Sequence, residues 1–170
     1  INFLNLDKNL ELVIDGILYS QYKFNVYKSD ENSVTNAISF KDIDTSVNEL
    51  KQHSVFWVRD LINTPALDKS PEIFIEKINE LVESSEIDVN IYDKKWLEEN
   101  NFGGVLGVAK GSDRPPYFLE GKYNPNAKYQ ISLIGKGVLF DTGGYSLKSP
   151  SGMETMKTDM SGAASAWGVI

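Results

Sequence analysis

The chain has 170 residues, a formal net charge of −7 and 41% apolar residues, a composition typical of a globular protein large enough to bury a core. It has no cysteine, which excludes disulfide bonds, thiolate zinc sites and cysteine nucleophiles, and we expect a cytoplasmic protein. The sequence pI near 4.8 argues against broad binding to nucleic acid, although a local basic patch stays open, and no apolar run is long enough to span a membrane.

The first part of the chain predicts helices and one ambiguous segment. Residues 12–27 alternate apolar and polar side chains around an Asp-Gly pair, which fits strand, turn and strand, or a short helix followed by a strand. The polar residues 28–33 predict a loop. Apolar side chains recur near helical spacing over 46–62, and Asn-Thr-Pro at 63–65 ends that helix because the residue before proline disfavours the α region. His53 in this helix reads as a structural or surface residue rather than a ligand.

The next part alternates helix and strand signals. Ser70 precedes proline and an amphipathic repeat, so we expect a helix that begins with Ser70 as its N-cap. The remaining signals are a strand at 88–93, a short helix at 94–101, a glycine-rich strand or loop at 103–112, and strands at 117–123 and 129–140. Strands separated by helices predict an α/β fold with a mixed, mainly parallel sheet flanked by helices.

Polar residues gather around the end of the last predicted strand. Asp141 follows that strand directly, at the position where α/β sheets usually place ligand sites. Lys136 stands between two glycines, which allow an ion or substrate to approach the backbone closely. The structural alternative is a β-bulge with an exposed lysine. No Ser or Thr follows Lys136 as a phosphate loop requires, so nucleotide binding is not favoured.

The following residues also have two readings. Asp159 precedes an alanine-rich segment and is a natural helix cap. Met153, Met156 and Met160 lie near helical spacing, which is more typical of a core than of a binding site. Taken singly, none of these residues establishes a function.

Four separated segments share the order and spacing of one known family. The stretch 135–164 contains Gly-Lys-Gly, Phe-Asp-Thr-Gly-Gly, Ser-Leu-Lys, Met-Lys-Thr-Asp-Met and Gly-Ala-Ala. Upstream lie "DGILYSQYKFNVYKS", "VRDLINTPALDKSP" and "GGVLGVAKGSDRPPYFLEGKYNP". Together these segments resemble the leucyl aminopeptidase family of metallopeptidases over most of the chain from about residue 15. Agreement in four places is far more specific than agreement with one short motif.

The resemblance implies a site with two divalent metal ions, Zn or Mn, with Mg or Co as alternatives. Asp141 would bridge both ions, and Lys136 and Asp159 would complete the more weakly held ion. Lys148 would be the catalytic lysine, whose ammonium stabilises the oxyanion of the tetrahedral intermediate. Met156 would line the pocket for an apolar first side chain such as leucine. Lys136 would ligate as a neutral amine, so the ion must offset a free pKa of about 10.4.

The resemblance also implies a domain organisation and partners. Residues 1–42 would be the C-terminal part of a smaller α/β N-terminal domain, and residues 43–170 a connecting helix and the first part of the catalytic domain. The family acts on peptides and is typically hexameric. It takes two more acidic ligands and an arginine from an Asp-x-Glu-x-Arg segment, which this sequence lacks. We therefore expect an incomplete chain that is inactive by itself. The alternative is a non-catalytic or DNA-binding member of the same fold, against which the acidic composition argues.

Overall fold

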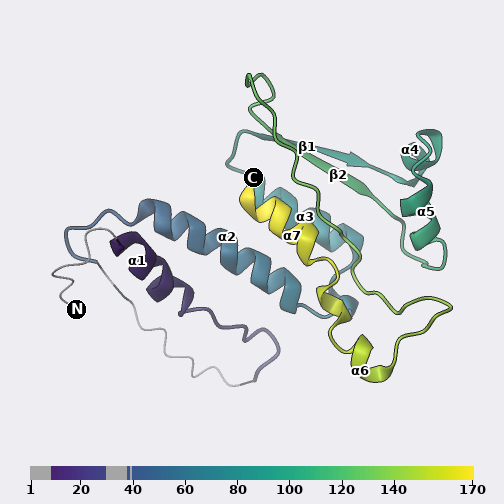
Figure 1. The fold of residues 1–170 in the computed structure, drawn as a ribbon, viewed down its shortest axis with the longest axis horizontal. Helices are drawn as coiled ribbons and strands as arrows, with labels where there is room; N and C mark the ends of the chain where they lie inside the picture. The colour runs from purple at the N-terminus through teal and green to yellow at the C-terminus, as the bar shows by residue number, and fades with distance from the viewer. Residues whose placement is uncertain (1–8, 30–37, 39) are drawn as a thin grey trace. The chain divides into compact units, whose positions relative to one another are not determined.

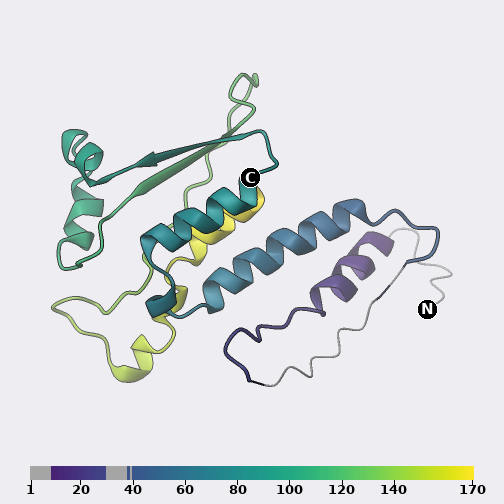
Figure 2. The same cartoon turned by 180° about the vertical axis from the view of Figure 1, so that it is seen from behind.

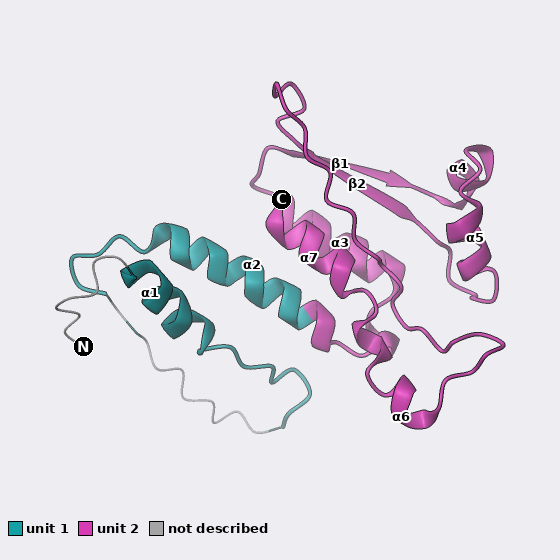
Figure 3. Ribbon diagram, viewed as in Figure 1, with its two compact units in different colours: residues 1–60 teal, residues 61–170 magenta. Residues whose placement is uncertain are grey.

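This computed structural model describes residues 9–29, 38 and 40–170 of the chain. Its contacts divide into two compact units, Ile1–Asp60 and Leu61–Ile170 (Figure 3). The boundary falls inside one long helix, so the domain limits expected from the sequence, 1–42 and 43–170, stay a prediction. Within the described residues, no helix combines the length and the apolar composition that crossing a bilayer requires.

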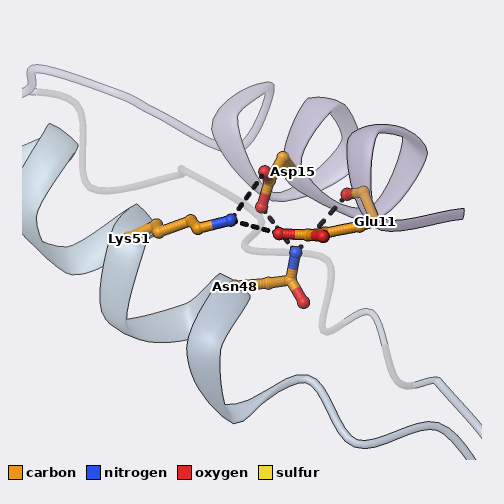
Figure 4. A network of polar contacts seen from close by, with 4 residues as sticks. All are labelled: Glu11, Asp15, Asn48 and Lys51. Carbon is orange, nitrogen blue, oxygen red and sulfur yellow. Dashed lines mark hydrogen bonds and ion pairs between the residues drawn. The ribbon is translucent and has the colours of Figure 1, made fainter. Parts of the chain in front are cut away.

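The first unit pairs two helices, α1 (Leu10–Tyr19) and most of α2 (Ser46–Asn63). The buried Asn48 side chain donates to Asp15 Oδ1 at 2.6 Å, and Lys51 forms ion pairs with Glu11 and Asp15 (Figure 4). These contacts join the two helices in a polar network. Because Asn48 is buried, its hydrogen bonds matter more for stability than the exposed ion pairs do.

Helix α1 confirms the short helix that one of the two alternatives places at the start of residues 12–27. The segment 12–27 was expected to hold at least one strand, but the described residues 20–27 contain none, and the helix runs through the Asp-Gly pair. The reason is the burial pattern, since Ile14 and Leu18 lie four residues apart and form one buried face. The loop expected at 28–33 lies outside the described residues from 30 onward.

The expected long helix is confirmed as α2, which ends directly before Thr64 and Pro65. His53 is exposed on it, in agreement with a surface role. A short 3₁₀ turn, η1 (Ala66–Asp68), follows and leads into α3 (Pro71–Val82). The Ser70 hydroxyl accepts a hydrogen bond from the Ile73 N–H at 3.2 Å, which confirms the expected N-cap.

The second unit continues with β1 (Ile87–Tyr92), α4 (Lys94–Glu99), α5 (Gly103–Ala109) and β2 (Phe118–Tyr123) (Figures 1 and 2). Both strands and the short helix α4 confirm the expectations. The helix α5 replaces the expected glycine-rich strand or loop. Its half-buried side chains, Val105, Leu106 and Ala109, fall on one helical face between exposed glycines. Because these glycines interrupt the apolar repeat, the sequence does not predict this helix.

The sheet of the described residues is a single antiparallel pair, β1 with β2, in which Ile87 faces Tyr123 and Tyr92 faces Phe118. The mixture of helix and strand is confirmed, but these strands do not form the expected mainly parallel sheet. The described segment 129–140 carries no strand, because nothing in the described chain pairs with it along a ladder. Its composition nevertheless favours β structure.

The chain ends in α6 (Pro150–Met153), the 3₁₀ turn η2 (Met156–Thr158) and α7 (Ser161–Val169). In the view of Figure 1, α3 and α7 both lie below the strand pair. A Cβ atom on Gly121 of β2 would lie 2.7 Å from the Trp167 ring, so α7 packs directly on this strand. Met160 and Ala164 are fully buried at the start of α7.

Candidate metal centre

Two glycines allow the chain to cross itself at the start of α7. A Cβ atom on Gly135 would lie 2.2 Å from the Gly162 carbonyl oxygen, which leaves no room for a side chain. The Ala163 N–H donates a hydrogen bond to the Lys136 carbonyl at 2.9 Å. The segment around Lys136 therefore lies across the first turn of α7, and this crossing places Lys136 beside Asp159.

Two ion pairs form at this crossing. Lys136 Nζ lies 2.7 Å from Asp159 Oδ2, and Lys148 Nζ lies 3.2 Å from Asp141 Oδ2. The close contact with Asp159 raises the pKa of Lys136, and the charge of Asp141 adds to the rise. Lys136 is thus within electrostatic reach of both carboxylates. The four residues form one cluster of two cations and two anions, which we call the charge cluster.

The loop from Asp141 to Lys148 is held by its own backbone. The Gly143 N–H donates to Asp141 Oδ1 at 2.8 Å, and the Lys148 N–H donates to the Thr142 carbonyl at 2.9 Å. The hydrogen bond from Gly143 lowers the pKa of Asp141, and Lys148 adds to this effect. Gly143 has φ +89°, and a Cβ atom there would lie 2.3 Å from the Ser146 carbonyl oxygen. Only glycine fits this turn without strain.

Asp159 presents a carboxylate oxygen with an unmet hydrogen-bonding capacity. Its Oδ2 atom is buried and accepts no hydrogen bond from the described residues, although Lys136 Nζ is close enough for an ion pair. We interpret the contact as an attraction of charges without a well-directed hydrogen bond. Buried polar atoms are normally satisfied, and here the Lys136 ammonium is the cation beside this oxygen, so a metal ion would have to share or replace that contact.

The donor atoms of the charge cluster fit part of a coordination shell. Carboxylate oxygens suit Mg and Mn, and carboxylate oxygen with nitrogen suits Zn. Asp141, Asp159 and a neutral Lys136 amine would supply three ligands. Within the described part of the chain, however, no three His, Cys, Asp or Glu side chains gather at one point. The residues present therefore fit a metal ion as a partial ligand set.

The structure also separates the two readings of the methionines and of Asp159. Met160 is fully buried and belongs to the core, as methionine at this spacing usually does. Met156 is half-buried in η2, three residues before Asp159, and so stays a candidate for substrate contact. The N-cap of α7 is Met160, without a side-chain cap, so the helix-cap reading of Asp159 is not supported.

Two lysines outside the expected set connect α2 to η2. Lys69 is completely buried, and Lys157 donates a hydrogen bond to the Asn63 carbonyl at 2.8 Å. Lys69 stands in the polar sequence Asp-Lys-Ser-Pro, which predicts a solvated loop. The sequence contains one signal that the Leu61 carbonyl needs a hydrogen-bond donor from elsewhere. The residue four positions later is a proline, which has no N–H.

Comparison with known proteins identifies the family of the chain. A model of the cytosol aminopeptidase family, catalytic domain, matches residues 56–170. A probable cytosol aminopeptidase of Clostridium perfringens is 34% identical over 183 residues, which cover 98% of this chain and 37% of that protein. A probable cytosol aminopeptidase of Phytoplasma mali is 36% identical, with coverage of 91% and 34%.

Solved structures show the same likeness. The cytosol aminopeptidase of Coxiella burnetii has a TM-score of 0.87 and 31% identity, and the match covers 96% of this chain and 35% of that one. The bottromycin maturation enzyme BotP in complex with Mn has a TM-score of 0.77 and 30% identity, with coverage of 93% and 34%. The chain belongs to the cytosol aminopeptidase family, whose members are hydrolases. It spans about a third of the length of the curated relatives that it matches.

Proposed function

We propose that this chain supplies part of the active site of a metal-dependent aminopeptidase, which releases N-terminal, leucine-like residues from peptides by two-metal hydrolysis. The observation that carries the proposal is the convergence of Lys136, Asp141, Lys148 and Asp159 in one charge cluster. Membership of the family and the likeness to an enzyme solved with Mn support it. Peptides would be the substrates, and a hexamer in the cytoplasm the working form.

Asp141, Asp159 and Lys136 would hold the metal ions, Zn or Mn, with Mg or Co as alternatives. When bound, divalent ions supply Lewis-acid chemistry, because they polarise a carbonyl and lower the pKa of water. Lys136 carries a raised pKa here and is an ammonium at neutral pH. It therefore has to lose its proton before its nitrogen can act as a ligand.

We infer that Lys148 acts as a fixed positive charge. Its side chain is 30% exposed and lies 3.2 Å from Asp141, so it is both accessible to a substrate and held near the carboxylate. An ammonium there would stabilise negative charge that develops on the oxygen of a scissile carbonyl. Met156, in the segment that leads to Asp159, would contact the apolar side chain of the first substrate residue.

The test is the binding of Mn²⁺, measured by isothermal titration calorimetry and by thermal melting in a metal-free buffer. At an Mn²⁺ concentration of a hundred times its Kd, binding contributes about 2.7 kcal/mol, which raises the Tm by about 5 to 10 °C. Asp141→Asn removes a charged ligand and should abolish this rise. Asp113→Asn makes the same chemical change in an exposed loop and should preserve it. An unchanged Tm of the wild-type protein with Mn²⁺ would contradict the proposal.

A further inference from the structure

The Lys69 side chain is fully buried, yet it carries an amine, which is rare in a protein interior. Its Nζ atom donates to the Leu61 carbonyl at 2.7 Å and to the Lys157 carbonyl at 2.9 Å. None of the Asp and Glu side chains in the described part of the chain forms an ion pair with it. The amine therefore serves two backbone carbonyls, one at the end of α2 and one in η2.

The sequence explains why a donor is needed at Leu61. In an α-helix this carbonyl would accept from the N–H of the residue four positions later. That residue is Pro65, which has no N–H. The Lys69 amine takes the place of the missing donor, at the helix end where the dipole also favours a cation. An apolar side chain of similar size would fill the space and leave the Leu61 carbonyl without a partner.

A second bridge runs in the opposite direction. Lys157 donates from its own Nζ atom to the Asn63 carbonyl at 2.8 Å, while its carbonyl accepts from Lys69. One direct hydrogen bond and one bridge through Lys69 thus connect Lys157 to the last turn of α2, within the unit that begins at Leu61. Asp159 follows two residues later, and Met156 precedes Lys157 directly.

We propose that Lys69 is a positioning residue for the candidate metal centre: it fixes the Lys157 carbonyl and thereby holds Asp159 opposite Lys136. The inference rests on the proposed function for its consequence in metal binding, but its structural part is independent of it. Outer-shell residues that orient metal ligands typically change metal affinity by 10- to 100-fold when they are replaced. Lys69 donates to none of the three proposed metal ligands, so any effect must pass through the η2 backbone.

A double variant separates positioning from simple stabilisation. Lys69→Met removes both hydrogen bonds, and Lys110→Met is the control at an exposed lysine. Pro65→Ala combined with Lys69→Met returns an N–H four residues after Leu61, so it should recover stability at that carbonyl. It cannot restore the bond to the Lys157 carbonyl. Each protein is studied well below its Tm by Mn²⁺ calorimetry and by hydrogen exchange of residues 156–159 without metal.

We expect the double variant to approach wild-type Tm, to exchange the amides of 156–159 at least tenfold faster, and to bind Mn²⁺ at least tenfold more weakly. Lys110→Met should match the wild type in all three measurements. Wild-type amide exchange in the double variant would show that Lys69 only stabilises the fold and would overturn the inference. Faster exchange with no Mn²⁺ binding by the wild-type protein would leave Lys69 as the positioning residue and refute the metal-dependent function instead.

Discussion

At the scale of single residues, Lys69 has the most perturbed environment described for an ionisable group. Burial lowers its pKa to about 8, and the charge of Lys157 adds to the shift. A neutral amine retains two N–H donors, which match the two carbonyls that accept from it. The bridge between α2 and η2 can therefore survive the loss of the proton.

This pKa predicts how stability depends on pH. Lys69 titrates near 8 in the folded protein and near 10.5 when unfolded, so between these values the unfolded state binds more protons. Stability should rise with pH in this window, by about 2 kcal/mol between roughly pH 7.5 and 9.5. Urea unfolding at both pH values measures the change. Lys69→Met should lack this rise, and an equal rise in that variant would assign the effect to another group.

Much of the candidate site could be predicted from the sequence, but the buried lysine that we propose holds it in position could not. Lys136, Asp141, Lys148 and Asp159 stand in a recognisable order, and the structure brings them together; their catalytic and metal-binding roles stay predictions. The burial of Lys69 could not be predicted, because a lysine beside Ser-Pro has the features of a surface residue. The proline after α2 indicates that a helix carbonyl needs another donor, but sequence cannot say which distant side chain supplies it.

At the scale of elements, the crossing of the segment 135–137 over α7 determines the site. It depends on backbone contact, so the glycine at 135 is required by packing, because a side chain there would meet the Gly162 backbone. The elements with strong local signals, such as α3 with its serine cap, were predictable. The helix α5 was hidden by its glycines, and the segment 129–140 has strand composition without a partner strand in the described chain.

Gly135→Ala should therefore destabilise the protein. The new methyl group would meet the Gly162 backbone at 2.2 Å, and relief of that overlap should cost about 1 to 3 kcal/mol and weaken Mn²⁺ binding. Gly104→Ala is the matched control, because nothing lies within 4 Å of its Cβ position and it stands in α5. That variant should be stabilised by up to about 1 kcal/mol. Equal unfolding midpoints for the two variants in urea would contradict the close packing of Gly135 on the first turn of α7.

At the scale of the whole molecule, charge argues against the DNA-binding alternative. The chain carries a net charge of −7. Lys94, Lys110 and Arg114 line one shallow surface depression, but Glu98 and Asp113 line it as well. The cations there are thus mixed with anions and do not form a stripe that could follow a phosphate backbone. The charge at this depression therefore gives no support to the DNA-binding alternative.

A gel-shift experiment tests whether the protein binds DNA. We expect no retardation of a short DNA duplex at low ionic strength, where phosphate contacts are strongest. A chain with a basic DNA-binding domain, run in parallel, confirms that the conditions detect binding. Retardation that disappears with added salt would favour the DNA-binding alternative.

The apolar side chains along and after the segment 129–140 have a practical consequence. Ile131 is 87% exposed and Ile134 95%, and the Tyr145 ring is fully exposed. Such surface is tolerated in solution while like-charged molecules repel one another. Near the pI of about 4.8 this repulsion vanishes, and the exposed rings and aliphatic groups are free to associate. Acidic buffers should therefore promote precipitation, and the colloidal stability of the protein depends on its carboxylates.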